Sequence, residues 1–360
     1  MPNSGYKQIL NFRGSANPNP LVPGGGRGSI DLINGVQTHG FWVTVTAQLD
    51  VTVNCTSVIN GGDILAALTF FLNQNGEDVW QMDGLIAGFL TQCMAASLVG
   101  NKVIPANANV QAATLLRSTC FLWSVNPWSV VPRETAFLEN DPRQRFQLQV
   151  NVNGATSAAA AATILRIGAG AATLTNIAVA IEQEYVANEV ALPFFRPRIR
   201  EQVDPVAAAN PALPSRIYTN NRVRGLVIKM ETDIAGLVTD IISGLAIRGD
   251  NGDLWGPQQV PWVDAVRKME TEFGGGVSAT SPYPNGSMLF INFQKYGRLA
   301  SVLYPYRDLA NFRIEYNATP SVTAGATNSR IRTSIIELER PAPVQDRNLI
   351  SPTLPDFLDT

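Results

Sequence analysis

The sequence predicts an all-β protein made of two similar sandwich halves in tandem. Three observations support this fold class: long segments alternate apolar and polar residues, motifs of the first half return in the second, and a proline-broken stretch separates the two. Helical periodicity is scarce by comparison. At 360 residues the chain is long enough for two domains, each with a core of its own.

The clearest predicted strand runs from Phe41 to Val53, where apolar side chains alternate with threonine, glutamine and aspartate. This period of two buries one face and leaves the other wet. Shorter segments of the same kind are Phe146–Val152 and Ile177–Tyr185. The best helical signal is Asp83–Leu98, although its two glycines weaken it. A second candidate helix is Trp262–Phe273.

Four motifs of the first half return in the same order in the second half. The pairs are His39–Val45 with Arg224–Met230, Asn75–Trp80 with Asn251–Trp255, Phe146–Asn151 with Phe312–Asn317, and Ile181–Glu184 with Ile336–Glu339. The offset falls from 185 residues for the first pair to 155 for the last. A duplication with shorter loops in the second copy produces such a trend, and two unrelated β domains are the alternative.

Short strands separated by Gly, Pro and Asn-Gly turns are typical of jelly-roll sandwiches. We therefore expect two tandem eight-stranded jelly-roll sandwiches with short inserted helices. The expected organisation is a flexible basic N-terminal arm at 1–30, a first jelly roll at 31–187, a linker at 188–221, a second jelly roll at 222–340 and an extended C-terminal tail at 341–360.

The composition disfavours most chemical functions. Charged residues make up 16% of the chain, below the usual fraction of about 25%, which suits a protein buried against other copies. The net charge of −2 does not favour nucleic-acid binding. With His39 as the single histidine, histidine-based catalysis and metal binding are poor expectations. We predict no enzyme, no cofactor, and no catalytic or metal-binding residues.

Other motifs are weaker. The three cysteines lack C-x-x-C spacing, which predicts buried free thiols: Cys55, Cys93 and Cys120. Arg248-Gly249-Asp250 is an attachment-like tripeptide, and the segment Asp250–Asp253 starts like a calcium loop but has Pro261 at the twelfth position. We interpret both as a turn. No apolar run typical of a signal peptide appears at the N-terminus.

The arrangement resembles the double jelly-roll major capsid proteins of tailless, membrane-containing bacteriophages (tectivirus-like). His39–Ala47 is similar to the glycine-led first long strand of that family's N-terminal jelly roll. Ile64–Asp78 is similar to the family's next segment, and Ile177–Tyr185 leads into a proline-broken linker as expected. The similarity covers about residues 30–340 and is one of architecture, without a signature motif.

The resemblance implies a virion protein that forms homotrimers with a pseudo-hexagonal outline. Such trimers tile an icosahedral shell around an internal membrane and contact other capsid proteins, such as vertex proteins. The protein would be made in the host cytoplasm and would bind no specific nucleic acid. The alternatives are a minor coat or spike protein, or a carbohydrate-binding or carbohydrate-cleaving double sandwich. Sugar-stacking candidates would be the tryptophans Trp80, Trp123, Trp128, Trp255 and Trp262.

The first 30 residues contain three basic residues and no Asp or Glu: Lys7, Arg13 and Arg27. Residues 18–28 are rich in Pro and Gly, which predicts flexibility. A basic arm of this kind could lie on the anionic headgroups of the internal membrane, and a solvated tail is the alternative. The arm shows no amphipathic helix of the kind that the family often carries there.

Overall fold

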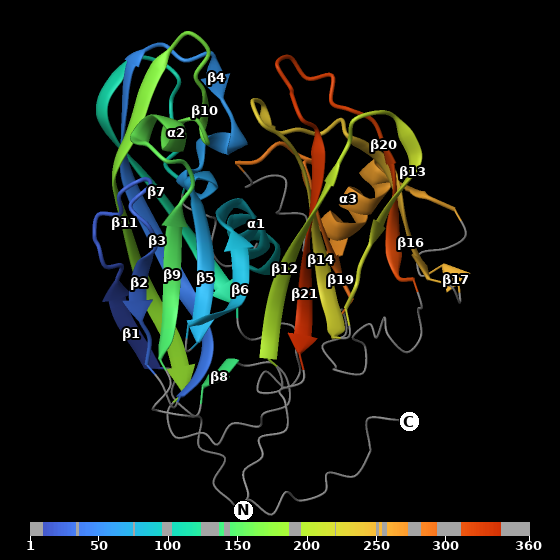
Figure 1. The fold of residues 1–360 in the computed structure, drawn as a ribbon, viewed down its shortest axis with the longest axis horizontal. Coiled ribbons are helices and arrows are strands. Elements are labelled where there is room, and N and C mark those ends of the chain that lie inside the picture. The colour runs from blue at the N-terminus through green and yellow to red at the C-terminus, as the bar shows by residue number, and fades with distance from the viewer. Residues whose placement is uncertain are drawn as a thin grey trace, which may run out of the picture.

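The computed structural model describes residues 10–33, 36–74, 76–95, 103–123, 137–139, 145–186, 196–219, 221–249, 252–253, 258–272, 282–293 and 311–339. Figure 1 shows two β-sandwiches standing side by side, the first in blue to green and the second in yellow to red. The long strands of both sandwiches run roughly along the same direction. Helices are short and lie between strands, as the sequence predicts.

The first sandwich consists of two antiparallel sheets. One has the strand order β1 (Leu10–Ser15), β11 (Ala171–Val186), β3 (Val36–Val53) and β7 (Gln111–Trp123), with β8 (Phe137–Glu139) also on β3. The other has the order β2 (Gly28–Asp31), β9 (Phe146–Val152), β5 (Leu68–Gln74) and β6 (Glu77–Asp83). The chain crosses between the sheets in the jelly-roll manner, so that its first and last main strands become neighbours.

Smaller elements complete the first half. A short ladder joins β4 (Ser57–Val58) to β10 (Leu165–Arg166), and 3₁₀ turns occupy Asn60–Gly62 and Ile64–Ala67. Helix α1 (Gly84–Ala95) follows β6, and the short α2 (Ser157–Ala161) precedes β10. Helix α1 lies within the predicted helical segment. Its N-terminus is capped by the Asp83 carboxylate, which accepts the Leu85 N–H at 2.9 Å.

The second sandwich repeats this plan. Its first sheet has the order β12 (Arg196–Pro205), β21 (Arg330–Glu339), β14 (Arg222–Thr232) and β15 (Gly236–Leu237), with β19 (Met288–Asn292) also on β14. Its second sheet has the order β13 (Asn210–Arg216), β20 (Arg313–Ala318), β16 (Ile242–Gly249) and β17 (Gly252–Asp253), with β18 (Val260–Pro261) also on β16. Helix α3 (Trp262–Glu272) follows β18, as α1 follows β6.

The predicted repeat holds at the level of single residues. Gly40 on β3 and Gly225 on β14 occupy the same place in their sheets, at the predicted offset of 185. A Cβ at Gly40 would lie 2.4 Å from the ring of Phe121 on β7, and one at Gly225 would lie 2.8 Å from the ring of Phe290 on β19. Each glycine therefore makes room for an aromatic ring from the next strand.

Other parts of the repeat also correspond. A register shift falls at the residue before each glycine, at His39 in the first half and at Arg224 in the second. The Phe146 carbonyl accepts an N–H from Leu32 at 3.0 Å, and the Phe312 carbonyl accepts one from Ile217 at 2.9 Å. The second motif pair lies at the β5–β6 and β16–β17 turns, and parts of it fall outside the described residues.

The fourth predicted match has the right strands but the wrong register. Ile181–Glu184 lies on β11 and Ile336–Glu339 on β21, which are equivalent strands. However, Gly40 pairs with Glu184, whereas Gly225 pairs with Ile336, so the offset is 152 instead of 155. Both segments begin with Ile-Glu and carry Glu at every second residue, and such short patterns look alike after a shift by several residues.

Two predicted boundary segments contain strands instead. Residues 10–15 and 28–30 of the predicted arm lie in β1 and β2, and half of the predicted linker at 188–221 lies in β12 and β13. All four strands lie at sheet edges, where proline and charged residues are tolerated. Their composition therefore resembles that of loops. Residues 1–9, 188–195 and the predicted tail at 341–360 lie outside the described residues.

Candidate functional site

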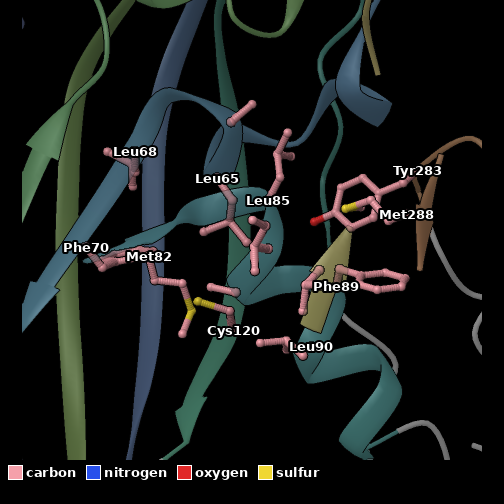
Figure 2. Close-up of a cluster of buried hydrophobic side chains, with 14 of the residues drawn as sticks. Leu65, Leu68, Phe70, Met82, Leu85, Phe89, Leu90, Cys120, Tyr283 and Met288 are labelled. Carbon is pink, nitrogen blue, oxygen red and sulfur yellow. The ribbon is translucent and has the colours of Figure 1, made fainter. Parts of the chain in front are cut away.

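The two halves meet along a buried surface that we call the seam. It is formed by β6, α1 and residues 60–67 of the first half, and by β12, β14, β19 and Tyr283 of the second. Figure 2 shows Tyr283 and Met288 of the second half beside Phe89 of the first. Helix α1 is buried on every side from Leu85 to Cys93. One continuous apolar core therefore spans both sandwiches.

A buried hydrogen bond crosses the seam next to this apolar cluster. The Tyr283 hydroxyl donates to Asp63 Oδ2 at 2.8 Å, and the Leu65 N–H donates to Asp63 Oδ1 at 2.9 Å. Burial raises the pKa of both Asp63 and Tyr283, so each group favours its neutral form. The pair fixes the segment around Tyr283 against the turn that precedes β5.

A buried lysine forms the second polar link across the seam. Lys229 on β14 places its Nζ 3.1 Å from Asp83 Oδ2 of the first half and 2.8 Å from Glu231 Oε2 of its own strand. The Lys229 side chain is only 2% exposed. Burial opposes its charge, but the two carboxylates raise the pKa of Lys229, so that it stays ionised. Asp83 therefore caps helix α1 and neutralises Lys229 at the same time.

Arginines extend this lysine–carboxylate cluster. Arg332 Nη1 lies 2.8 Å from Glu201 Oε2, and its Nη2 lies 2.9 Å from Glu231 Oε1. Arg330 also binds Glu231, at 2.6 Å, and binds Asp233. Burial acts against ionisation of Glu231, but the neighbouring lysine and arginine hold its pKa well below the usual range. Each charge in this network needs a partner of opposite sign within contact distance, because a buried charge without one strongly destabilises the fold.

Two further hydrogen bonds join the halves. Asn60 Oδ1 accepts the Leu237 N–H at 2.8 Å, and Arg166 Nη1 donates to the Ala324 carbonyl at 2.6 Å. Together with the Tyr283 and Lys229 contacts, they tie the halves at several separate points. The seam is the candidate functional site, because it sets how the two sandwiches are held relative to each other.

The predicted basic arm is engaged with the first sandwich where it is described. Arg13 lies on β1 and forms an ion pair with Glu182 at 3.1 Å. Arg27 binds Asp78 at 2.8 Å and stacks 3.6 Å above the Phe71 ring. The prediction of a flexible arm is therefore wrong for these two arginines, because Arg13 lies in the edge strand β1 and Arg27 is held by Asp78 and the Phe71 ring. Lys7 lies outside the described residues.

Other sequence motifs are used within the fold. Arg248 of the Arg-Gly-Asp tripeptide binds Glu315 at 2.5 Å, and Asp250 lies outside the described residues. No group of three metal-ligating side chains occurs in the part of the chain that the structure describes. Trp80 and Trp262 are buried, so they offer no surface for a sugar. The side chains of the other three candidate tryptophans are not among the described ones.

The cysteines behave as predicted. All three are buried and free: Cys55, Cys93 and Cys120. Burial raises their thiol pKa values, which suppresses the reactive thiolate. Among the described helices, none is long and apolar enough to span a membrane.

Comparisons with known proteins find similarity in structure but not in sequence. No protein-family model matches the chain. No curated protein matches it either. Among solved structures, the STIV MCP covers 95% of this chain and 100% of its own, with a TM-score of 0.64 and 12% identity. The chain has a double jelly-roll fold.

Two other solved structures support the same fold. The major capsid protein from Bacteriophage PM2 covers 91% of this chain and 98% of its own, with a TM-score of 0.54 and 13% identity. A chain from the PBCV-1 virus capsid covers 94% of this chain and 95% of its own, with a TM-score of 0.58 and 11% identity. The double jelly roll thus extends over nearly the whole chain, as the sequence predicts.

The seam itself was not found from the sequence. Lys229, Glu231, Arg330 and Arg332 carry no motif, and their partner Asp83 lies 146 residues from Lys229. One sequence signal pointed toward it: Lys229 is a charged residue within an otherwise apolar stretch of a predicted strand, at a position where the first half has Thr44. Such a difference between repeats marks a place where the two copies have different surroundings.

Proposed function

We propose that the chain is a major capsid protein that builds the icosahedral shell of a virus. The observation that carries this proposal is a double jelly roll that matches capsid proteins over nearly their whole lengths. The seam adds to it, because a capsid building block must hold its two sandwiches in one fixed relation. The proposed role is structural and not enzymatic, and the proposed location is the virion.

We infer that the building block is a homotrimer. Each chain supplies two sandwiches of the same topology, so three chains supply six similar units in a ring. Such a ring has a pseudo-hexagonal outline and can tile a shell. The proposed partners are further copies of the chain and other capsid proteins, such as vertex proteins. Synthesis in a host cytoplasm belongs to the same proposal.

Contact with an internal membrane is a separate part of the proposal. Arg13 and Arg27 are paired with carboxylates of the first sandwich, so Lys7 is the remaining basic candidate of the arm. One lysine per copy gives only about 1 kcal/mol at an anionic surface. Many copies on one shell would be needed for a stable contact.

The test is light scattering of the purified protein at several concentrations, with negative-stain images of the same peak. A trimer of roughly 117 kDa, three times the chain mass of 38.9 kDa, with a hexagonal outline supports the proposal. A monomer at every concentration, without shells or lattices, contradicts it. A monomer that binds glycans on an array would instead support the carbohydrate-binding alternative.

A further inference from the structure

We propose that Asn285 is a site of spontaneous deamidation, and that its isoaspartate product loosens the seam. The side-chain amide of Asn285 is the reacting group, water is the co-reactant, and no enzyme is needed. An asparagine followed by glycine is especially prone to this reaction, because glycine has no side chain to hinder attack by its own backbone nitrogen. The inference does not depend on the proposed capsid role.

The sequence offers several Asn-Gly pairs, and the structure allows three of them to be compared. The pairs begin at Asn34, Asn60, Asn75, Asn153, Asn251 and Asn285. Both residues of the pair are described for Asn60, Asn153 and Asn285. These three share the reactive dipeptide, so differences between them must come from the fold.

The fold restrains the first two of these side chains. Asn60 Oδ1 accepts the Leu237 N–H at 2.8 Å, and its Nδ2 donates to the Thr163 carbonyl at 2.7 Å. Asn153 is held in the same way, by the Thr69 hydroxyl at 2.8 Å and by a backbone carbonyl at 3.1 Å. An amide held at both its oxygen and its nitrogen cannot turn toward its own main chain. The structure therefore protects both of these asparagines.

The third side chain, Asn285, is exposed and unrestrained. It lies in a turn that the Ser287 N–H closes by donating to the Pro284 carbonyl at 3.0 Å, with Gly286 at a φ of +82°. Among the described residues, no hydrogen bond holds the Asn285 amide or the Gly286 N–H. A Cβ at Gly286 would have only Trp262 Nε1 near it, at 3.7 Å. Both reacting groups are thus open to water and free to approach each other.

The reaction consists of two balanced steps. The backbone nitrogen of Gly286 bonds to Asn285 Cγ, and the side-chain amide leaves as ammonia together with the Gly286 amide proton, which closes a succinimide ring. Water then opens the ring at one of its two carbonyl groups. Opening at the side-chain carbonyl gives aspartate, whereas opening at the main-chain carbonyl gives isoaspartate. Both products carry a negative charge, and the isoaspartate main chain is longer by one methylene group.

The turn lies in a segment that the seam holds at both ends. We call residues 282–288 the strap. Before the turn, Tyr283 donates to Asp63 of the first half at 2.8 Å. After the turn, Met288 begins β19 and pairs with Lys229. Figure 2 shows the side chains of Tyr283 and Met288 beside helix α1. Extra main-chain length between these two fixed ends must be accommodated within the strap.

The strap has little room for a longer main chain. A Cβ at Gly88 of α1 would lie 2.3 Å from the Tyr283 hydroxyl, so the tyrosine fills the space above this glycine. The Gly286 carbonyl accepts the Trp262 indole N–H at 2.7 Å. Close-packed contacts of this kind transmit a backbone shift to their neighbours. Isoaspartate at position 285 should therefore weaken the hydrogen bond that Tyr283 makes to the first half.

The experiment ages the purified protein in mildly alkaline buffer at physiological temperature. Peptide mapping by mass spectrometry follows the conversion of each amide into an acid and separates aspartate from isoaspartate. We expect the Asn285 peptide to convert at least about tenfold faster than those of Asn60 and Asn153, because each of these must first break two hydrogen bonds. Protein aged in denaturant is the control, in which the three peptides should convert at similar rates.

Thermal unfolding of the aged protein measures the effect on the seam. Ageing should lower the midpoint by about 1–3 °C. Asn285→Gln should keep its midpoint during ageing, because the longer side chain cyclises far more slowly. Asn285→Asp carries the charge without the longer main chain and should unfold within about 1 °C of the parent. Tyr283→Phe lacks the hydrogen bond to Asp63, so ageing should lower its midpoint less than that of the parent.

The contrary outcomes are distinct. Conversion at Asn60 or Asn153 as fast as at Asn285 overturns the assignment of the site. An unchanged midpoint after conversion, or an Asn285→Asp variant as unstable as the aged protein, overturns the effect of the longer main chain. Residues 285–287 also form an N-glycosylation acceptor, Asn-Gly-Ser, and a glycan found on Asn285 overturns the proposal because it blocks the amide. Light scattering tests the proposed trimer separately from all of these.

Discussion

The β1–β11–β3–β7 sheet and the β12–β21–β14–β19 sheet share their path, their register shift and their glycine beneath a phenylalanine ring, but differ on one face. The first carries Thr44 and Thr46 at the two positions of β3 where β14 of the second carries the buried Lys229 and Glu231. Features that fix backbone pairing occur in both sheets. The side chains on the outward face instead differ according to what covers them.

Breaking the ionic network should have the largest effect. Lys229→Met leaves the carboxylates of Asp83 and Glu231 without their lysine, and we expect a loss of about 3–5 kcal/mol in the free energy of unfolding. Denaturant titration measures it. The matched change Thr44→Ala in the first half should cost less than about 0.5 kcal/mol. Equal losses at the two positions would show that the network does not stabilise the fold.

Replacing the equivalent glycines Gly40 and Gly225 should lower the stability of the protein by similar amounts. A Cβ at Gly40 would lie 2.8 Å from the Leu122 carbonyl, and one at Gly225 would lie 2.9 Å from the Ile291 carbonyl. We expect about 1–3 kcal/mol of destabilisation from each Gly→Ala change, measured by thermal and denaturant unfolding. Gly244→Ala, where the nearest atom lies at 3.3 Å, is the milder control. A neutral result at Gly40 alone would mean that the two sites are not equivalent.

Acid should weaken the second sheet more than the first. The folded-state pKa of Glu231 is depressed, so its stabilising contribution is complete above the ordinary Glu pKa of about 4.3 and is lost as the pH falls. Between about pH 5 and pH 3, the free energy of unfolding of Glu231→Gln should therefore fall by about 1–2 kcal/mol less than that of the parent protein. Thr46→Gln, at the equivalent position of the first half, should leave the pH profile unchanged. An unaltered profile in Glu231→Gln would contradict the assignment.

The smallest effect is expected at the edge strands. Arg13 on β1 and Glu201 on β12 take equivalent positions, but the Arg13 side chain is 83% exposed whereas Glu201 is mostly buried against Arg332. Arg13→Ala should change the free energy of unfolding by less than about 0.5 kcal/mol, since exposed ion pairs contribute little. Glu201→Ala should cost clearly more in the same titration. A larger cost at Arg13 would reverse this comparison.

The sequence predicted the parts of the fold that depend on local periodicity. The β3 strand, helix α3 and three of the four repeat matches follow from alternation, turns and glycine positions. The edge strands β12 and β13 were taken for a linker, because four prolines and several charges hide their pairing: Pro197, Pro205, Pro211 and Pro214. Applying the 185-residue offset to the segment before His39 would have shown β13 as the equivalent of β2 in the second half.

The candidate site could not be predicted in this way. Its ion pairs join residues far apart in the chain, and the charge on Lys229 is compatible with burial only because Asp83 and Glu231 meet it in the folded structure. A strand pattern alone would place such a lysine in solvent. The comparison of equivalent positions in the two copies is the sequence signal that comes closest to revealing the seam.

The double role of Asp83 has a consequence for cooperativity. One carboxylate caps helix α1 and also holds Lys229, so loss of the contact between halves leaves Lys229 without this partner and exposes a mostly apolar helix. Neither sandwich should therefore melt independently of the other. Calorimetry should record a single heat-absorption peak for the whole chain, and the first half expressed alone should not give a stable fold.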